Sequence, residues 1–365
     1  MIKYNTKRLP YIAAAFLMIS TISLSLTSCG SPADSNDIGK APAVGAEGTD
    51  EEKTTPAETT SGGKQQVTIR VADMAAWNNA YFEYGEDRGL LDSFFENDKY
   101  DIEFKIDSFA NGPAEIEAFA AGELDFASMG SMPATTGASS DFGFKIVGVN
   151  AVTTSFGNVV VLADSEINSV QELKGKKVGT IFGGTLHYYA GRFLEDSGLS
   201  YDDVEFINVG NEAATSLRAG EIDAGVISDS LTVELTNEGT VRVIANKMNG
   251  VVGFSEVCIA DRIINDYDGL AAVLLKGFDD LYRYIDANSD DYLDYLGGLT
   301  GVDISSVKAT WNNSDHKVSS LDDEVIYSNA EELLVWMQAQ DLVENTDVKF
   351  EEIIDLSVAR EAGIN

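Results

Sequence analysis

The chain has 365 residues, of which 44% are hydrophobic and 9% aromatic, enough to form two domains with substantial cores. Its 60 acidic residues against 25 basic ones give a formal net charge of -35. A surface of that sign repels nucleic acid and anionic lipid headgroups, so the composition argues against both as partners and is typical of a highly soluble body.

Residues 1–28 predict a cleaved export signal. Basic residues at positions 3, 7 and 8 precede an apolar run from Tyr11 to Leu26 that is too short for a comfortable membrane span. The run ends in Leu26-Thr27-Ser28-Cys29-Gly30, which resembles the lipobox of bacterial lipoproteins. This resemblance implies that Cys29 becomes the N-terminus and carries a diacylglycerol on its sulfur. A plain secretory signal with an incidental cysteine is the alternative.

Residues 29–65 predict a disordered tether behind the lipidated cysteine. They are rich in Ser, Thr, Gly, Ala, Pro and acidic residues, and they contain too few large apolar side chains to offset chain entropy. The only other cysteine is Cys258, within an apolar run. Because Cys29 would be consumed by lipid, we expect no intramolecular disulfide and interpret Cys258 as a buried hydrophobic residue.

From Val67 onward, short β-rich runs alternate with helical stretches, which is typical of an α/β protein. The segment Ala121-Gly122-Glu123-Leu124-Asp125-Phe126-Ala127 recurs as Ala219-Gly220-Glu221-Ile222-Asp223-Ala224-Gly225. Each copy follows the same order of strand, loop, helix, strand and helix, so we infer one unit of parallel strands present twice. The glycine of each copy is expected to end a helix. The predicted strands are 67–72, 101–106, 177–181 and 204–209, and the predicted helices are 81–95, 113–121, 187–196 and 213–219.

Two further segments, 155–164 and 253–261, resemble each other and follow the two units. We interpret them as paired crossover strands that form a hinge between two lobes. The predicted fold is therefore two-lobed α/β, each lobe a mainly parallel sheet flanked by helices. Residues 66–157 plus 258–365 form lobe 1 and residues 158–257 form lobe 2. Apolar spacing near 3.6 then predicts helices over 270–287, 289–296 and 330–339, which we expect to pack mainly on lobe 1.

An open parallel sheet presents its ligand crevice beyond the carboxyl ends of its strands. The segments at those positions carry hydroxyls, small residues and a few aromatic side chains, with no cluster of bases. The candidate ligand-binding residues are Trp77, Asn78, Ser128, Met129, Gly130, Thr153, Thr154, Ser155, Gly184, Thr185, His187 and Asp229.

Several of these residues have a simpler explanation. Gly184 and Thr185 at a helix start expose backbone N–H groups that favour an anion, but ordinary N-capping explains them equally well. Trp77 stacks on a ligand or fills the core. His187 is more often a structural residue in such a position, and Asp229 either binds a cationic group or caps a helix.

Catalysis finds little support. The two histidines, His187 and His316, lie far apart in sequence, and the chain contains no G-x-S-x-G, Walker, H-E-x-x-H, C-x-x-C or D-x-D-x-D-G motif. We therefore predict that the protein is not an enzyme and needs no cofactor or metal.

Residues from about 108 to 226 resemble the aliphatic sulfonate, taurine and nitrate branch of substrate-binding proteins of ATP-driven importers, which are related to thiamine-precursor binding proteins. The resemblance rests on the segments 112–126, 170–179, 184–188 and 198–200. It implies a type II periplasmic-binding-protein-like fold, with the ligand held by the candidate residues at 77–78, 128–130, 153–155, 185 and 187. The chain departs from this family at Gly184, where a serine usually stands, and at Ser228-Asp229, in place of a Trp-Asp pair.

The expected function is that of an extracytoplasmic solute-binding component of an ABC importer, lipid-anchored to the bacterial membrane. It would capture a small organic anion, such as a sulfonate, taurine or nitrate, between its lobes and deliver it to the permease. A pyrimidine or thiamine-precursor-like heteroaromatic is the alternative ligand. A pyrimidine-synthesis enzyme is a weaker alternative, because such enzymes need a cysteine-rich motif that this chain lacks. We expect a monomer whose partners are the solute, the permease subunits and the membrane, through the lipid only, with no nucleic acid.

Overall fold

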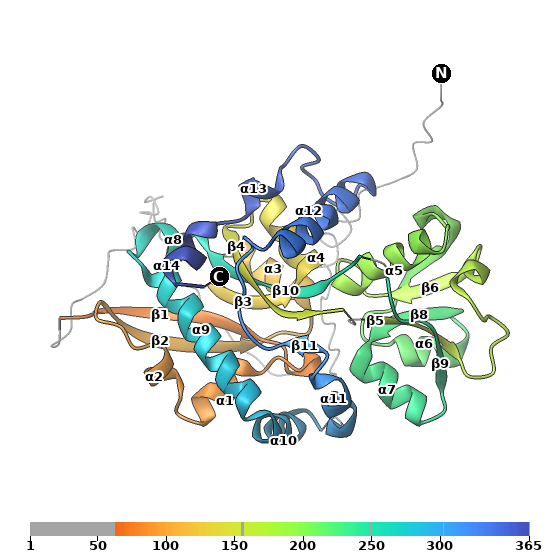
Figure 1. Ribbon diagram of the computed structural model, residues 1–365, viewed down its shortest axis with the longest axis horizontal. Helices are drawn as coiled ribbons and strands as arrows, with labels where there is room; N and C mark the ends of the chain where they lie inside the picture. Colours follow the sequence, from red (N-terminus) through yellow and green to blue (C-terminus); the bar gives the residue numbers. More distant parts are fainter. Residues whose placement is uncertain (1–62, 155–156, 249, 302, 365) are drawn as a thin grey trace, which may run out of the picture. The chain divides into compact units, whose positions relative to one another are not determined.

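The computed structural model describes residues 63–154, 157–248, 250–301 and 303–364. The predicted leader, Cys29 and nearly all of the predicted tether lie outside these residues. In the part of the chain that is described, no helix is both long enough and apolar enough to cross a membrane. The described residues form two lobes, each built around its own β-sheet with helices packed against it (Figure 1).

The first lobe contains a six-stranded sheet. Its strands are β1 (Gln65–Asp73), β2 (Tyr100–Ser108), β3 (Phe126–Gly130), β4 (Phe144–Thr153), β10 (Gly253–Ala260) and β11 (Ser314–Asp315), in the order β11-β4-β10-β3-β1-β2. Its N-terminal helices are η2 (Ala75–Trp77), α1 (Tyr81–Asp87), α2 (Leu91–Phe94), α3 (Gly112–Ala120) and α4 (Ser131–Ser139). β1 is parallel to β2 and β3, whereas β10 is antiparallel to β3 and β4.

The second lobe contains a five-stranded sheet. Its strands are β5 (Gly157–Leu162), β6 (Lys177–Thr180), β7 (Glu205–Asn208), β8 (Ala224–Ser228) and β9 (Val241–Ala245), in the order β7-β6-β8-β5-β9. Its helices are η3 (Val170–Leu173), α5 (Thr185–Asp196), η4 (Tyr201–Asp203), α6 (Ala213–Ala219) and α7 (Asp229–Asn237). β6 is parallel to β7 and β8, and β5 is antiparallel to β8 and β9.

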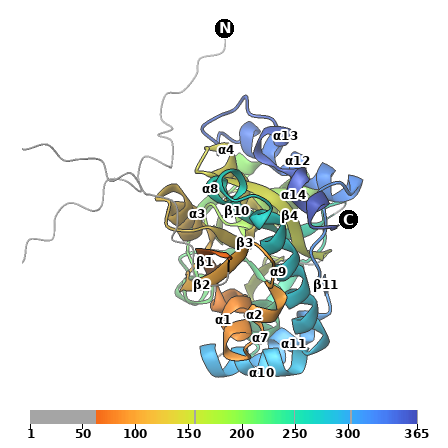
Figure 2. The same cartoon turned by 90° about the vertical axis from the view of Figure 1, so that its left-hand side faces the viewer.

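The C-terminal region adds helices to the first lobe. They are α8 (Asp261–Asp266), α9 (Leu270–Ala287), α10 (Ser289–Thr300), α11 (Ile304–Trp311), α12 (Glu324–Ala339), α13 (Phe350–Ile353) and α14 (Leu356–Glu361). α9 confirms the predicted helix at 270–287, and its apolar face is buried along its length. Figure 2 shows α9 running alongside the first sheet, where Phe278 packs edge-on against Phe126 of β3 with ring centroids 5.2 Å apart.

These C-terminal helices pack mainly on the first lobe, as predicted, and two of them also contact the second lobe. α11 packs against α7, and Trp336 of α12 packs edge-on against Tyr188 of α5 with ring centroids 5.2 Å apart. The indole Nε1 of Trp336 also donates a hydrogen bond to Glu195 of α5 over 2.9 Å. Two C-terminal helices therefore bridge to the second lobe.

The internal repeat is confirmed by the topology. β2-β1-β3 in the first sheet and β7-β6-β8 in the second have the same order and the same parallel directions. The glycines that follow the helices, Gly122 and Gly220, have φ values of 67° and 70°, the left-handed conformation that lets a helix end.

The aspartate of the repeat has the same backbone role in both lobes. The Asp125 carboxylate accepts a hydrogen bond from the N–H of Arg70 in β1, and the Asp223 carboxylate accepts one from Lys177 in β6, over 2.9 and 2.8 Å. In return, the N–H groups of Asp125 and Asp223 donate to the carbonyl oxygens of Arg70 and Lys177. This reciprocal pair fixes the start of the third strand beside the first in each lobe.

The structure corrects the predicted hinge. The similar segments 155–164 and 253–261 do not pair with each other, because β5 lies in the second sheet and β10 in the first. They hold equivalent places instead, each antiparallel to the third strand of its unit. The expected lobe boundary at 257/258 falls inside β10, which pairs with β3 and β4 from Gly253 to Ala260. One continuous ladder cannot be divided between two sheets, so the chain returns to the first lobe before Gly253.

Candidate functional site

A cavity of about 1320 Å³, including the part open to solvent, lies between the two sheets and is lined by residues of both lobes. It is reached by the C-terminal ends of β3 and β8 and by the N-termini of α3, α5 and α7. We call it the interlobe cavity. Its position agrees with the rule that ligands bind beyond the carboxyl ends of parallel strands.

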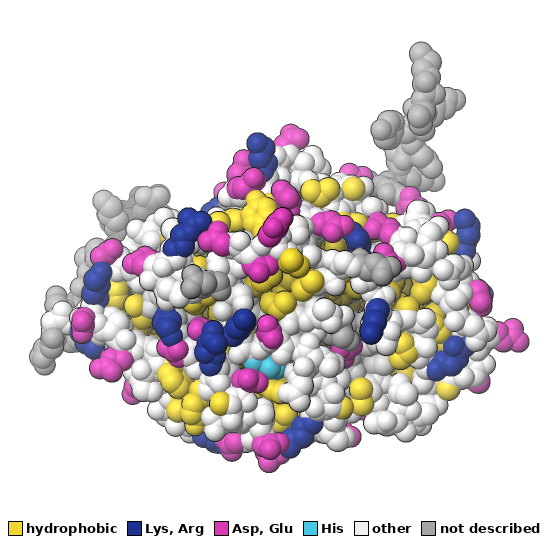
Figure 3. All heavy atoms as spheres, in the orientation of Figure 1, with side chains coloured by type: hydrophobic (Ala, Val, Ile, Leu, Met, Phe, Trp, Pro, Cys, Tyr) yellow, Lys and Arg dark blue, Asp and Glu magenta, His cyan; other side chains and the backbone are white. Residues whose placement is uncertain are grey.

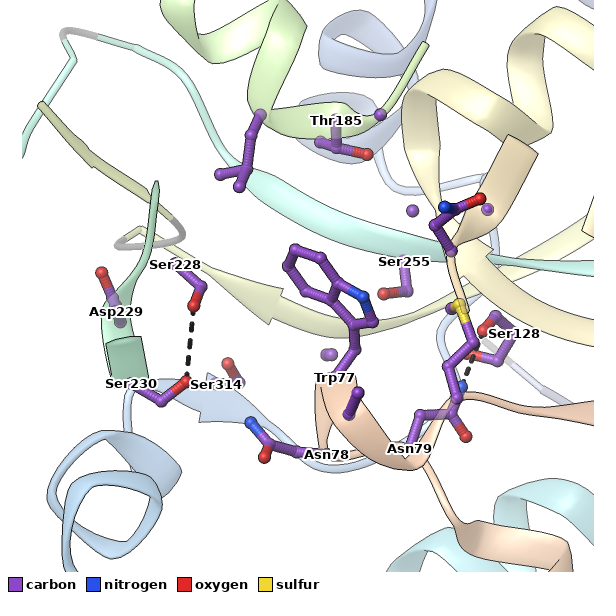
Figure 4. A pocket seen from close by; sticks show the side chains of 18 of the residues that line it. Trp77, Asn78, Asn79, Ser128, Thr185, Ser228, Asp229, Ser230, Ser255 and Ser314 are labelled. Atoms are coloured by element: carbon purple, nitrogen blue, oxygen red, sulfur yellow. Dashed lines mark hydrogen bonds between the residues drawn. The ribbon is translucent and has the colours of Figure 1, made fainter. Parts of the chain in front are cut away.

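The loop after β1 supplies one wall of the cavity. Trp77 projects from η2 into the pocket in Figure 4, and its Nε1 donates a hydrogen bond to the carbonyl oxygen of Ala110 over 3.2 Å. Asn78 has a φ of 64°, which turns the chain back toward α1. The carbonyl oxygen of Asn78 accepts a hydrogen bond from the Tyr292 hydroxyl, and Asn79 Nδ2 donates to the carbonyl oxygen of Ser128. The loop is therefore held from two sides.

The end of β3 is one of the places where the two lobes touch. Ser128 lines the cavity, and its hydroxyl donates a hydrogen bond to Asn150 Oδ1 over 2.9 Å. Gly130 caps α4 and faces Thr185 of the second lobe so closely that a Cβ at this position would lie 2.4 Å from Thr185 Oγ1. The same Oγ1 accepts a hydrogen bond from the backbone N–H of Met132 over 3.2 Å. This contact joins the lobes directly.

The second lobe contributes two helix starts. Gly184 caps α5, and the first N–H groups of that helix have no carbonyl of their own helix to bind. At the start of α7, Ser228 Oγ accepts from the N–H of Leu231, and Asp229 Oδ1 accepts a hydrogen bond of 2.6 Å from Asn158 Nδ2. Figure 4 shows Ser228, Asp229 and Ser230 on one side of the pocket, across from Ser128 and Ser255.

A third part of the lining comes from the C-terminal region, where no ligand-binding residue was predicted from the sequence. Val307, Thr310 and Trp311 of α11 line the cavity together with Ser314 and His316. The one feature of the sequence that could have indicated a binding role for this segment is its composition, two aromatic rings in a short polar stretch. Ser255 of β10 and Tyr282 of α9 were also missed.

The lining mixes apolar and polar residues and carries few charges. Among the residues that line the cavity in the described ranges, Asp229 is the one carboxylate, and none is Lys or Arg. Asp73 sits just behind the Trp77 loop, fully buried, and accepts hydrogen bonds from the N–H groups of Phe82 and Glu83. Burial raises the pKa of Asp73 to about 7. Elsewhere, acidic and basic side chains are interspersed over the face shown in Figure 3.

Seven of the twelve predicted site residues line the interlobe cavity. They are Trp77, Asn78, Ser128, Gly130, Gly184, Thr185 and Asp229. Met129 does not, because neighbouring side chains of a strand point to opposite faces and Met129 is fully buried behind the sheet. The Thr153 hydroxyl donates to the carbonyl oxygen of Asn313 and does not line the cavity; nor does the exposed Thr154. Ser155 lies outside the described residues.

His187 also faces away from the cavity. It is 3% exposed, its ring stacks on Phe182 with centroids 4.8 Å apart, and its Nε2 lies 2.5 Å from the Tyr201 hydroxyl. Burial lowers the pKa of His187 to about 4, so the ring is neutral at physiological pH. Its surroundings are those of a structural residue within the second lobe. Within the described ranges, no group of three or more His, Cys, Asp or Glu side chains is arranged to hold a metal ion.

Comparison with known proteins identifies relatives of this fold. A family model described as NMT1/THI5 like matches residues 93–262. A Bacillus subtilis protein named for binding aliphatic sulfonates is 23% identical over 76% of this chain and 83% of its own. A Haemophilus influenzae protein named for thiamine biosynthesis is 34% identical, but over only 31% of this chain and 35% of its own.

Among solved structures, the alkanesulfonate-binding protein SsuA from Xanthomonas axonopodis pv. citri, bound to MOPS, superimposes with a TM-score of 0.69. The match covers 79% of this chain and 98% of that one at 20% identity. The predicted two-lobed binding-protein fold is thereby confirmed.

Proposed function

We propose that this chain is the extracytoplasmic solute-binding component of an ABC importer, because residues 93–262 match the family model described as NMT1/THI5 like. The observation that carries the proposal is the interlobe cavity, to which both lobes contribute the ends of strands and the starts of helices. The sulfonate-binding relatives are binding proteins rather than enzymes, and the activity proposed here is capture without chemical conversion.

The proposed ligand is a small organic anion such as a sulfonate. The starts of α5 and α7 open onto the cavity with hydroxyl groups of Ser128, Ser228 and Ser255 around them. Helix N-termini and neutral donors bind oxyanions without a lysine or arginine, since the exposed N–H groups carry partial positive charge. Two relatives named for sulfonate binding support the same ligand class.

A second ligand class is favoured by the charge of the lining. Asp229 lines the cavity, and the described part of the lining contains no Lys or Arg. With Trp77 as a stacking surface, these residues suit a neutral or cationic heteroaromatic of the pyrimidine type. The thiamine-biosynthesis relative fits this alternative.

One variant separates the two ligand classes. Asp229→Asn removes the negative charge from the cavity, so an anionic solute should bind more tightly and a cationic heteroaromatic more weakly. The control is Glu234→Gln, which removes a charge from the same helix outside the lining. Isothermal titration calorimetry with taurine, alkanesulfonates, nitrate and an aminopyrimidine, on folded protein stripped of ligand, measures the effect. If none of these solutes binds and mass spectrometry finds no co-purified small molecule, the proposed function is wrong.

The remaining parts of the proposal concern location and assembly. We propose that Cys29 carries the lipid that holds the protein on the outer side of the cytoplasmic membrane, and that a monomer delivers solute to the permease. Cys29→Ala should move the protein from the membrane fraction to the soluble fraction and abolish labelling by a fatty-acid analogue. Light scattering that reported a stable dimer would contradict the monomer.

A further inference from the structure

The C-terminal side of the interlobe cavity forms an aromatic wall. Trp311 of α11 and His316 stack face to face with centroids 4.1 Å apart and planes 8° from parallel. Tyr282 of α9 meets the His316 ring edge-on at 5.4 Å. All three residues line the cavity, and we call them the aromatic wall. The wall lies outside residues 93–262, the range that matches the family model.

Hydrogen bonds hold the wall rigidly. Nε2 of His316 donates to the carbonyl oxygen of Trp311 over 2.8 Å, which leaves Nδ1 facing the Tyr282 hydroxyl at 3.1 Å. Trp311 packs on its other side against Tyr292, with centroids 5.5 Å apart, and is 8% exposed. These side chains therefore lose little conformational entropy when a ligand packs against them, which is the condition for strong aromatic contacts.

The apolar residues elsewhere in the lining point in the same direction. An oxyanion headgroup at the starts of α5 and α7 would occupy only that part of the cavity. Met74, Pro113, Pro133 and Val307 add apolar surface to the lining, Val307 from the same helix as Trp311 and the two prolines near the start of α5. A ligand that consists of a headgroup alone would leave this apolar surface in contact with water.

We propose that the aromatic wall selects solutes that carry a planar ring or a comparably extended apolar group beside their polar headgroup. This inference rests on the proposed solute-binding function and deepens it. The headgroup contacts the helix starts of the second lobe, and the ring packs against His316, which is only half-buried, and the edge of Trp311 behind it. Because α11 also packs against α7, a ring at the wall lies where the two lobes meet.

The test compares probes that share a headgroup and differ in the ring. Benzenesulfonate is titrated against methanesulfonate, and 4-aminopyrimidine against formamidine, by calorimetry with the mature chain. In the headgroup pair that binds, we expect the ring-bearing member to bind at least 10-fold more tightly. Trp311→Leu should remove most of that preference and leave the affinity for the small member within about 2-fold, whereas Trp311→Phe should retain most of the preference.

Two further variants guard against a folding defect. Thr310→Phe adds bulk to the cavity side of α11 and should weaken the ring-bearing probe alone. Tyr327→Leu removes an aromatic ring that packs on Phe350, away from the cavity, and should change neither probe. Equal binding of ring-bearing and small probes, or an equal loss of both in Trp311→Leu and Thr310→Phe, would overturn the wall and leave solute binding intact. If neither pair binds and no solute co-purifies, the proposed function fails and the wall with it.

Discussion

The two aspartates of the repeat should contribute very different amounts of stability, although they have the same backbone role. Asp125 is fully buried between two guanidinium groups: Arg70 reaches it through Nε and Nη2, both at 2.7 Å, and Arg262 through Nε at 2.6 Å. For Asp223, the corresponding position of the second lobe, the structure gives the backbone N–H of Lys177 as the donor, and the residue is half-buried. We predict that Asp125→Asn is much more destabilising than Asp223→Asn.

The magnitude follows from what each change leaves behind. Removing one partner of a buried ion pair costs about 3–5 kcal/mol, because the remaining charge is buried without compensation. The Arg70 and Arg262 side chains are 24% and 36% exposed, so water relieves part of that cost. We therefore expect a loss of about 3 kcal/mol for Asp125→Asn. Asp223→Asn keeps an acceptor for the Lys177 N–H and should cost about 1 kcal/mol or less.

Urea unfolding followed by circular dichroism measures both variants. A pH series adds an independent readout, since burial raises the pKa of Asp125 but its hydrogen bonds to Arg70 and Arg262 outweigh burial and lower it overall. The contribution of Asp125 is thus present above the pKa of the unfolded state, about 3.9, and is lost as the pH falls through the lower folded pKa. Equal losses in the two variants, or the same acid sensitivity in wild type and Asp125→Asn, would refute this account.

Three other changes test the lobe contacts and the buried acid. Gly130→Ala should weaken solute binding at least 10-fold with little change in melting temperature, because its Cβ would lie 2.4 Å from Thr185 Oγ1; unchanged calorimetric affinity would contradict this. Burial raises the pKa of Asp73 to about 7, so the protonated carboxyl group stabilises the folded state. This contribution to the free energy of unfolding, up to about 4 kcal/mol, is fully present below pH ~3.9 and is lost as the pH rises through 7. The free energy of unfolding of Asp73→Asn in urea should lack that pH dependence. The same pH profile in the variant and the wild type would show that Asp73 does not cause it. Trp336→Leu should cost about 3 kcal/mol in thermal unfolding, because the indole fills the space beside Gly191; a loss below 1 kcal/mol would show that the contact is loose.

The sequence predicted the repeated units well because their signals are local. A helix that ends in glycine, an acidic turn and a buried strand lie within one short segment, and both copies repeat it. The predicted helix 81–95 is wrong in one respect. Gly89, at a φ of 64°, separates α1 from α2. Glycine in that conformation ends a helix more readily than apolar spacing can extend it.

Two of the wrong site predictions could have been avoided by considering which way side chains point in a strand or a helix. Met129 follows Ser128 in a strand, and successive side chains point to opposite faces, so both cannot line one cavity. His187 follows Thr185 by two positions in a helix, which turns it by about 200° away from the same surface. The aromatic wall could not have been found in this way. Its hydrogen bond joins His316 to Tyr282, and only tertiary packing brings α9 and α11 to the cavity.

The chain crosses from the first sheet to the second before β5 and returns to the first sheet before β10, and this connection has a mechanical consequence. β5 follows β4 of the first sheet but lies in the second sheet, and β10 follows β9 of the second sheet but lies in the first. A rotation of one lobe against the other would change the contacts between them. Such a rotation would also shear α12 along α5 at Trp336 and α11 along α7, since these helices touch across the lobes. Solute binding would therefore be coupled to the C-terminal region at two places: where α11 reaches the cavity, and where Trp336 contacts α5 outside the lining.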